Sequence, residues 1–286
     1  MDSVKPAVQE IRDSVRLALE EDRAAFDVTS IAVVPESTLC EAKIVSKGSG
    51  VLAGVDYALE AFLQCDKNIT FNISANDGDK VSPGTDIMRV KGLARRVLSA
   101  ERVALNFLQQ LSGTATLTSQ AVKMAGGIKV LDTRKTVPGL RYAQKYAVSI
   151  GGGNNQRHNL EDEFLLKENH FTLSGLSYSE TVKKAVALSQ GKVVGVEAET
   201  FEQAREALKC GVDYVLLDNF RDNNLVDAVS ALRKEFPEAV LEASGGYTIE
   251  MLPSLASVGI DRISIGALTH SATALDISLL LNLIYD

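Results

Sequence analysis

The residues best suited to chemistry gather in one stretch of the sequence, residues 132–170, where several cationic side chains surround a run of three glycines. The whole chain of 286 residues is acidic, with a formal net charge of −7, so this local excess of positive charge needs a local explanation. A small ligand with several negative charges provides one, since arginine binds carboxylates and phosphates through paired hydrogen bonds and lysine acts as a point charge. The cations are Arg134, Lys135, Arg141, Lys145, Arg157 and Lys167.

Two alternative explanations stay open for these cations. One is a solvated charged face, and the other is ion pairing with acidic residues at the ends of strands. For Arg141 and Lys145, which lie four residues apart on a predicted helix, a solvated face explains the charges at least as well as a ligand does.

Two carboxylates and two glycine turns further along the chain suit a phosphorylated sugar. Glu197 and Asp218 each follow a short apolar run, and such carboxylates bind ribose hydroxyls or Mg²⁺, or pair with neighbouring cations. Two later turns follow the last two apolar runs, where backbone N–H groups of α/β barrels hold phosphate monoesters. Ordinary turn glycines are the alternative. The residues of these turns are Ser244, Gly245, Gly246, Ile265, Gly266 and Ala267.

The three histidines, His158, His170 and His270, show no metal-ligand spacing. His170 is the best candidate among them for a site role, because it closes the segment that begins with Lys167 at the end of a predicted strand. The sequence contains neither a Gly-x-Ser-x-Gly elbow nor a Walker loop, so neither a serine hydrolase nor a P-loop enzyme is indicated.

The elements that must position these residues alternate between short apolar runs and helical stretches after residue 127. Such alternation predicts a parallel sheet, and six runs spaced by roughly 20 to 35 residues indicate an α/β barrel, with an open doubly wound sheet as the alternative. Both architectures bind their ligand at the C-terminal ends of the strands, where the candidate residues fall. The predicted strands are 128–131, 164–166, 193–196, 214–217, 240–243 and 262–265, and the predicted helices are 179–190, 201–210 (N-cap Thr200), 225–236 and 249–258.

The chain before this alternation predicts a small α+β unit with antiparallel strands, including a helix at residues 8–21 and a strand at residues 42–46. A long helix at residues 93–111 carries an apolar stripe, and Arg102 lies well off that stripe, so Arg102 must face another surface. We expect Ser112–Gly113 to end or kink this helix and the boundary between two units to fall there.

Composition argues against several classes of function. The acidic balance and the lack of a basic stripe with interleaved aromatics argue against nucleic-acid binding. Three widely spaced cysteines favour reduced thiols in a cytoplasmic protein over a disulfide framework or a zinc site. The polar start is not typical of a signal peptide. The longest apolar run near the C-terminus, residues 277–284, is too short to span a bilayer and is predicted to form a buried helix.

Seven motifs, in a consistent order, resemble those of the quinolinate phosphoribosyltransferase family, and the match covers nearly the whole chain. It extends into the N-terminal region through LEEDRAAFDVTS at residues 19–30 and GVLAG at residues 50–54. The seven are AERVALNFLQQLSGTAT (100–116), DTRKTVPGLR (132–141), YAVSIGGGNNQR (146–157), FLLKENH (164–170), LLDN (216–219), EASGG (242–246) and IGALTHS (265–271).

The resemblance implies an activity and an architecture. The family converts quinolinate and phosphoribosyl pyrophosphate, with Mg²⁺ and no tightly bound organic cofactor, to nicotinate mononucleotide, pyrophosphate and CO₂ in de novo NAD biosynthesis. Its fold has an N-terminal α+β open-sandwich domain, here residues 1–112, an incomplete α/β barrel, here residues 113–272, and a C-terminal helix, here residues 273–286, that joins the first domain. A cytoplasmic homodimer, or a hexamer, with no nucleic-acid or membrane partner is also implied, with Arg102 supplied to each site across the interface.

The resemblance also assigns roles residue by residue. The two late glycine turns match the family's loops for the 5′-phosphate, and Glu197 and Asp218 match its carboxylates on the ribose or Mg²⁺ side. Lys135, Lys167, Glu197 and Asp218 are the implied catalytic residues. The implied substrate-binding residues are Arg102, Thr133, Arg134, Lys135, Gln156, Arg157, Lys167, His170, Glu197, Asp218, Ser244, Gly245, Gly246, Ile265, Gly266 and Ala267.

One position departs from the family pattern. The family has Asn-His-Arg after the glycine triplet, whereas this chain has Asn155-Gln156-Arg157. Gln156 can hydrogen-bond a carboxylate but cannot carry a positive charge, so we expect weaker quinolinate binding rather than lost activity. The alternatives are a same-fold relative of the molybdenum-transport-associated type that uses another aromatic acid, a non-catalytic anion-binding protein, and a phosphosugar aldolase with a Schiff-base lysine.

Overall fold

A computed structural model describes residues 5–220 and 222–283 of the chain, which divides into two compact units. The first unit contains residues 1–119, 136–152 and 268–286, and the second contains residues 120–135 and 153–267. The candidate residues predicted at strand ends all belong to the second unit. Arg102, Arg141 and Lys145 belong to the first unit.

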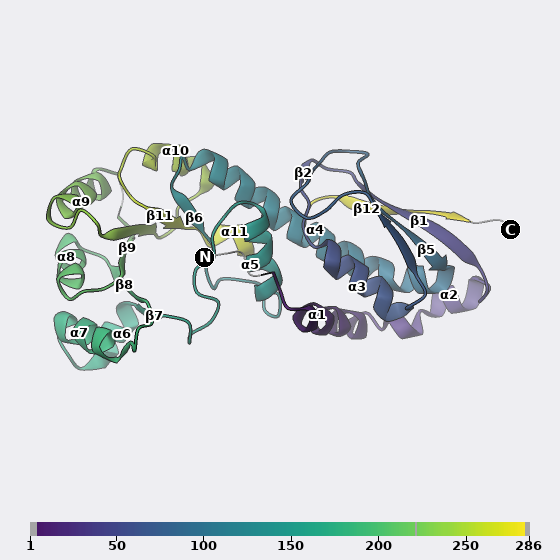
Figure 1. Cartoon of the computed structure of the whole chain (residues 1–286), viewed down its shortest axis with the longest axis horizontal. Coiled ribbons are helices and arrows are strands. Elements are labelled where there is room, and N and C mark those ends of the chain that lie inside the picture. The colour runs from purple at the N-terminus through teal and green to yellow at the C-terminus, as the bar shows by residue number, and fades with distance from the viewer. Residues whose placement is uncertain (1–4, 221, 284–286) are drawn as a thin grey trace. The chain divides into compact units, whose positions relative to one another are not determined.

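The first unit is built on an antiparallel four-stranded sheet with the strand order β12-β1-β5-β3 (Figure 1). The predicted helix at residues 8–21 is confirmed as α1, which buries Ile11 and Val15. An α+β open sandwich is therefore the architecture of this unit. Its strands are β1 (Leu39–Ser46), β2 (Gly50–Val51), β3 (Thr70–Ile73), β4 (Lys80–Val81), β5 (Asp86–Leu93) and β12 (Ile277–Leu283), and its helices are α1 (Val8–Glu21), η1 (Ala24–Phe26), α2 (Val28–Val33), α3 (Val55–Cys65), most of α4 (Ala94–Met124), α5 (Arg141–Ile150) and most of α11 (Ala267–His270).

The helix does not end at Ser112–Gly113, because α4 continues from Ala94 to Met124. The hydroxyl of Ser112 is buried and accepts a hydrogen bond from the Ala53 main-chain nitrogen at 2.9 Å. A Cβ atom at Gly113 would lie 2.2 Å from the main-chain oxygen of Thr273. The glycine therefore permits a close backbone contact, at a cost of about 1 kcal/mol in helix propensity relative to alanine.

The predicted C-terminal helix is also wrong, because the described part of that run, Ile277–Leu283, forms the strand β12. It pairs antiparallel with β1 in a register that places Ile277 opposite Ser46 and Leu281 opposite Ala42. Ile277 is buried, whereas Leu280 and Leu281 are exposed at the edge of the sheet. A mostly apolar run of this length has no clear period that separates a strand from a helix, and here pairing with β1 decides the structure. Residues 284–286 lie outside the described part.

The second unit contains six parallel strands in the order β6-β11-β10-β9-β8-β7, and helices α6 to α9 lie along their outer side (Figure 1). This is the order of a barrel, because each strand follows its predecessor in the chain and the first lies next to the last. The described strands β6 and β7 do not pair, so the barrel is incomplete. The strands are β6 (Lys129–Leu131), β7 (Phe164–Leu166), β8 (Val194–Ala198), β9 (Tyr214–Asp218), β10 (Val240–Ser244) and β11 (Arg262–Ser264).

All six predicted strands are confirmed, and the strand order excludes the doubly wound alternative. Thr200 caps its helix as predicted, by accepting a hydrogen bond from the Gln203 main-chain nitrogen. The single helix predicted at residues 249–258 is wrong, since two short helices replace it, the second with a proline in its first turn. The helices are α6 (Glu168–Ser174), α7 (Tyr178–Leu188), α8 (Phe201–Lys209), α9 (Asp222–Glu235), η2 (Ile249–Met251) and α10 (Leu252–Leu255).

Candidate active site

The ends of neighbouring strands β7 and β8 are joined by an ion pair between Lys167 and Glu197. Lys167 follows β7 directly, and its main-chain nitrogen donates to Nδ1 of His170 at 2.9 Å. The structure thus gives His170 a capping role at the start of α6, which fixes the turn that carries Lys167. The Glu197 side chain is 12% exposed and the Lys167 side chain is 44% exposed, so the pair lies at the surface of the strand ends.

Asp218, at the end of β9, extends this pair into a larger charged group. Burial raises the pKa of Asp218, and the negative charge of Glu197 raises it further, whereas Lys167, a hydrogen bond from Ser244 and Lys135 oppose the rise. These groups interact only because they are close together. The four residues predicted to be catalytic, Lys135, Lys167, Glu197 and Asp218, therefore form one electrostatic cluster.

The turn after β10 requires glycine for two reasons. Gly245 and Gly246 have φ angles of +97° and +61°, in the left-handed region that side chains rarely adopt. A Cβ atom at Gly245 would also lie 2.5 Å from Oδ1 of Asn219 and 2.8 Å from its main-chain nitrogen. Asn219 in turn donates from Nδ2 to Asp218 at 2.7 Å. The backbone of this turn is therefore packed closely against the segment that contains Asp218 and Asn219.

The second predicted phosphate turn, residues 265–267, offers fewer main-chain N–H groups to a ligand than the sequence suggested. The main-chain nitrogen of Ile265 donates to the Leu131 oxygen at 2.9 Å, so it is committed to the sheet. The Ile265 side chain is buried, and α11 begins at Ala267. Gly266 and Ala267 are thus the two residues of this turn that follow the last residue bonded to the sheet, Ile265.

Asp132 brings the two cationic segments together. It is fully buried at the end of β6, where its carboxylate accepts from Nδ2 of Asn155 at 2.6 Å and from the main-chain nitrogen of Gln156 at 2.9 Å. Asn154 also forms a parallel bridge with Leu131. The segment that ends in Arg157 is thereby anchored beside the segment that contains Thr133, Arg134 and Lys135, and the Thr133 hydroxyl accepts from the Lys135 main-chain nitrogen at 3.0 Å.

Arg157 is half-buried, and its Nη1 donates to the main-chain oxygen of Glu163 at 3.2 Å. Its Nε is buried and makes no hydrogen bond within the described part of the chain. A buried donor of this kind is rare in folded proteins unless a ligand or water completes it. This is the structural observation that most directly supports an anionic ligand near residues 156 and 157.

Sequence reasoning missed Asp132 and Glu242 as residues that organise the site. Glu242 is fully buried within β10, and its Oε1 accepts from Nε2 of Gln156 at 3.0 Å. Burial raises the pKa of Glu242, while Arg262 and Ser264 oppose the rise. The available signal was an acidic residue inside an otherwise apolar strand, since buried acids occur almost only where they are paired.

Three cations of the sequence analysis lie in the first unit. Arg102 is exposed on α4 and borders a cavity of about 700 Å³ that is also lined by α1 and by residues 137–140. Arg141 donates from Nε to the Thr136 hydroxyl at 3.2 Å. Lys145 is fully buried on α5, so the solvated face considered for it is wrong.

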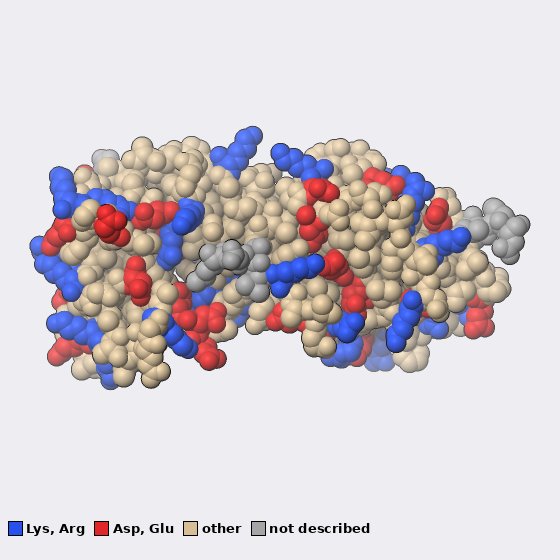
Figure 2. All heavy atoms as spheres, in the orientation of Figure 1, with Lys and Arg blue, Asp and Glu red and all other residues tan. Residues whose placement is uncertain are grey.

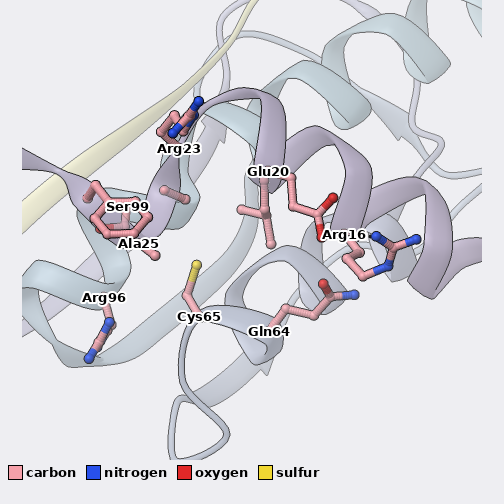
Figure 3. Close-up of a pocket in the computed structure, with 11 residues that line it drawn as sticks. Arg16, Glu20, Arg23, Ala25, Gln64, Cys65, Arg96 and Ser99 are labelled. Atoms are coloured by element: carbon pink, nitrogen blue, oxygen red, sulfur yellow. Dashed lines mark hydrogen bonds and ion pairs between the residues drawn. The ribbon is translucent and has the colours of Figure 1, made fainter.

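A second hollow of the first unit, of about 350 Å³, is lined by Cys65 and several arginines (Figure 3). Burial raises the pKa of the Cys65 thiol to about 11, so a reactive thiolate is not populated at neutral pH. The side chains of Arg16, Arg23 and Arg96 point away from one another in Figure 3. This hollow therefore has neither the nucleophile nor the converging cations of a second active site.

The surface and the described helices bear on partners. Figure 2 shows acidic and basic side chains interspersed on the visible face, which is unlike the basic stripe of a nucleic-acid-binding protein. Among residues 5–220 and 222–283, no helix is both long enough and apolar enough to cross a membrane.

An incomplete α/β barrel that presents cations, paired carboxylates and a glycine turn at its strand ends defines a class of protein that binds phosphorylated, multiply anionic small molecules. Comparison with known proteins gives the family. The C-terminal domain of quinolinate phosphoribosyl transferase matches residues 114–280, and the N-terminal domain of the same family matches residues 27–112. The chain belongs to the quinolinate phosphoribosyl transferase family.

Individual relatives are similar over almost the full length. A protein of Bacillus subtilis named as a probable nicotinate-nucleotide pyrophosphorylase [carboxylating] is 43% identical over 91% of this chain and 89% of its own length. A mitochondrial quinolinate phosphoribosyltransferase [decarboxylating] of Nicotiana tabacum is 38% identical over 96% of this chain and 84% of its own. The solved nicotinate-nucleotide pyrophosphorylase of Francisella tularensis has a TM-score of 0.91 and 38% identity, and the alignment covers 99% of this chain and all of that one.

Proposed function

We propose that this protein is a quinolinate phosphoribosyltransferase of de novo NAD biosynthesis, which converts quinolinate and phosphoribosyl pyrophosphate to nicotinate mononucleotide, pyrophosphate and CO₂. The family and its relatives, similar over nine-tenths of the chain or more, support this reaction. The observation that carries it is the cluster of Lys135, Lys167, Glu197 and Asp218 at the strand ends. Cations suited to the anionic groups of the substrates and carboxylates suited to a ribose meet there.

The cluster supports a mechanism based on orientation and electrostatics. The lone pair of the pyridine nitrogen forms a bond to C1 of the ribose while the bond from C1 to pyrophosphate breaks, through a transition state with oxocarbenium character. The carboxylates of Glu197 and Asp218 stabilise the positive charge on the ribose, and Lys135 and Lys167 stabilise the negative charge on the leaving pyrophosphate. The cationic ring then accepts the electron pair of the C2–carboxylate bond, CO₂ leaves, and a proton from solvent replaces it at C2.

Glu197 and Asp218 also fit the Mg²⁺ that accompanies phosphoribosyl pyrophosphate. Carboxylate oxygens are the protein ligands that Mg²⁺ prefers, and it is usually held by one or two of them together with substrate phosphates and water. The described residues contain no group of three or more acidic, histidine or cysteine side chains that would form a complete cage. The donor set thus suits an ion that arrives with its substrate, where it would neutralise charge on the pyrophosphate.

A homodimer with shared sites, or a hexamer built from such dimers, is the assembly we propose. Arg102 supports it, because this exposed arginine points away from the buried stripe of α4 and borders a large cavity. Analytical ultracentrifugation of the wild-type protein tests the assembly. Its three free cysteines favour a cytoplasmic location.

The pKa of Asp218 predicts an acid limb in the pH profile. The ionised form stabilises the ribose cation, so kcat/KM for phosphoribosyl pyrophosphate should fall as the pH drops through the pKa of Asp218, which lies above the ordinary value of 3.8. Lys135 lowers this pKa, so in Lys135→Ala the limb should move to higher pH. A pH–rate profile of both proteins measures the shift, and a limb at the same pH in both would contradict the assignment.

A steady-state assay tests the proposed function. Purified protein receives phosphoribosyl pyrophosphate, Mg²⁺ and either quinolinate or nicotinate, and the formation of nicotinate mononucleotide and CO₂ is followed. Product with quinolinate alone is the expected result. Gln156, in place of the histidine typical of the family, favours a second candidate, a same-fold relative of the molybdenum-transport-associated type that uses another aromatic acid. A folded protein that binds phosphoribosyl pyrophosphate but turns over neither acid would favour that candidate.

A further inference from the structure

Glu242 is a carboxylate with no access to solvent, placed on β10 between β9 and β11. Such a charge is costly unless it is paired. Its Oε2 lies 2.7 Å from Nε of Arg262, the residue directly opposite on β11. The contact is an ion pair rather than an aligned hydrogen bond, because neither atom meets hydrogen-bond geometry with a partner in the described chain.

Arg262 is itself held in place from its other side. Its guanidinium lies 3.9 Å from the centre of the Tyr214 ring, and the Tyr214 hydroxyl donates to Oε1 of Glu163 at 2.9 Å. A glycine at position 195 makes room for this ring, since a Cβ atom there would lie 2.1 Å from Cζ of Tyr214. Glu242 is therefore fixed by a rigid set of neighbours and has one oxygen, Oε1, directed to residue 156.

Gln156 is held at both of its ends. Its main-chain nitrogen donates to Asp132 at the end of β6, and its side-chain Nε2 donates to Glu242 on β10. Strand β11 lies between those two strands, so the residue reaches across it. A glutamine on a loop has several freely rotating bonds, and both anchors together restrict it to one orientation beside Arg157.

We propose that Glu242 is a positioning residue for the aromatic acid: it fixes the side chain of residue 156, which together with Arg157 meets the ring carboxylates. This inference rests on the proposed function. A buried carboxylate–arginine pair adds little stability over an apolar pair of the same size. The effect of the Glu242 carboxylate is instead on Gln156, which lies 86 positions away in the sequence and donates a hydrogen bond to it.

The same contact explains which side chains position 156 accepts. A residue that faces Glu242 must donate a hydrogen bond, and both an amide and an imidazole do so. A carboxylate would be repelled, and an aliphatic side chain would leave Oε1 of Glu242 buried without a partner. Glutamine therefore replaces histidine here without disrupting the buried pair, although it loses the positive charge.

A double-mutant cycle tests the positioning role. Glu242→Leu, which has no acceptor for the Gln156 amide, and Gln156→Leu are made singly and together, and KM is measured for each substrate. Each single variant should raise KM for quinolinate about tenfold, the effect of one hydrogen bond, with KM for phosphoribosyl pyrophosphate within about twofold of wild type. The double variant should be no worse than either single variant. Factors that multiply in the double variant, or equal rises for both substrates, would overturn the proposal.

A second series covers the case in which Glu242→Leu does not fold. Gln156→His keeps the hydrogen bond to Glu242 and restores a chargeable donor, so its KM for quinolinate should fall below that of wild type. Gln156→Glu opposes Glu242 and should bind quinolinate more weakly than Gln156→Leu. The reverse order in either comparison contradicts the positioning role.

Calorimetry separates this inference from the proposed function. A wild type that binds quinolinate without turning it over refutes the proposed function but leaves the positioning role measurable as an affinity in both series. A wild type that neither binds nor converts quinolinate refutes both. Calorimetric titration with phosphoribosyl pyrophosphate shows in each variant that the remainder of the site is intact.

Discussion

Replacing Lys167 by alanine is expected to lower kcat/KM by about 10²–10³-fold, the loss typical of removing one group that stabilises transition-state charge. Lys167 pairs with Glu197 and lowers the pKa of Asp218. Without Lys167, the negative charges of Glu197 and Asp218 are less well neutralised, and the leaving pyrophosphate loses a stabilising cation. The affected step is the transfer itself, so kcat should fall together with kcat/KM.

Stability should change little in Lys167→Ala, because the pair is partly exposed and such pairs contribute about 0–1 kcal/mol. Lys183→Ala is the matched control, since Lys183 is an exposed lysine on the outer helix α7. Steady-state kinetics and thermal unfolding of both variants make the comparison. A loss of activity in Lys167→Ala no larger than that in Lys183→Ala would remove Lys167 from the catalytic group.

Gly245→Ala is expected to raise KM for phosphoribosyl pyrophosphate by about 10–10²-fold, since backbone strain of this kind costs roughly 1–3 kcal/mol. Alanine there would hold a φ angle near +97° and would place Cβ 2.5 Å from Oδ1 of Asn219. The turn must therefore move, and with it the backbone that we propose binds the 5′-phosphate. Asn219 would be displaced too, which disturbs its hydrogen bond to Asp218.

Gly211→Ala isolates the effect of the φ angle from the effect of the contact. Gly211 also has a positive φ, +82°, but a Cβ atom there would meet nothing within 4 Å. This control should lose some thermal stability and keep the affinity for phosphoribosyl pyrophosphate. Calorimetric titration of both variants with that substrate gives the comparison. Equal affinities would show that the 245 turn does not bind the phosphate.

The barrel could be predicted from sequence because buried parallel strands are short apolar runs with clear ends. Each of the six runs ends in a polar or glycine residue, and those ends place Lys167, Glu197 and Asp218 without any knowledge of the fold. Helix caps such as Thr200 are local signals of the same kind. This part of the structure depends on residues that are close together in the sequence.

The wrong predictions share a different cause, which is dependence on a distant partner. Gly113 gives the same local signal whether it ends a helix or allows a backbone contact, and only the position of Thr273 distinguishes the two. The run at residues 277–283 is a strand because β1 is available to pair with it. Asp132 and Glu242 organise the site through Gln156. An acid in an apolar strand indicates a buried, paired charge, but no local pattern identifies Gln156 as the partner.

The strand β12 has a consequence for the order in which the protein can assemble during synthesis. Its partner β1 is made near the start of the chain, whereas residues 277–283 are made more than two hundred residues later. At about 5–20 residues per second, the ribosome leaves that edge of β1 uncovered for at least about ten seconds. Exposed strand edges pair readily with other chains. The second unit can complete its six-stranded sheet during that interval. Synthesis of the first unit therefore begins before that of the second unit, but the first unit can complete its own sheet only after it.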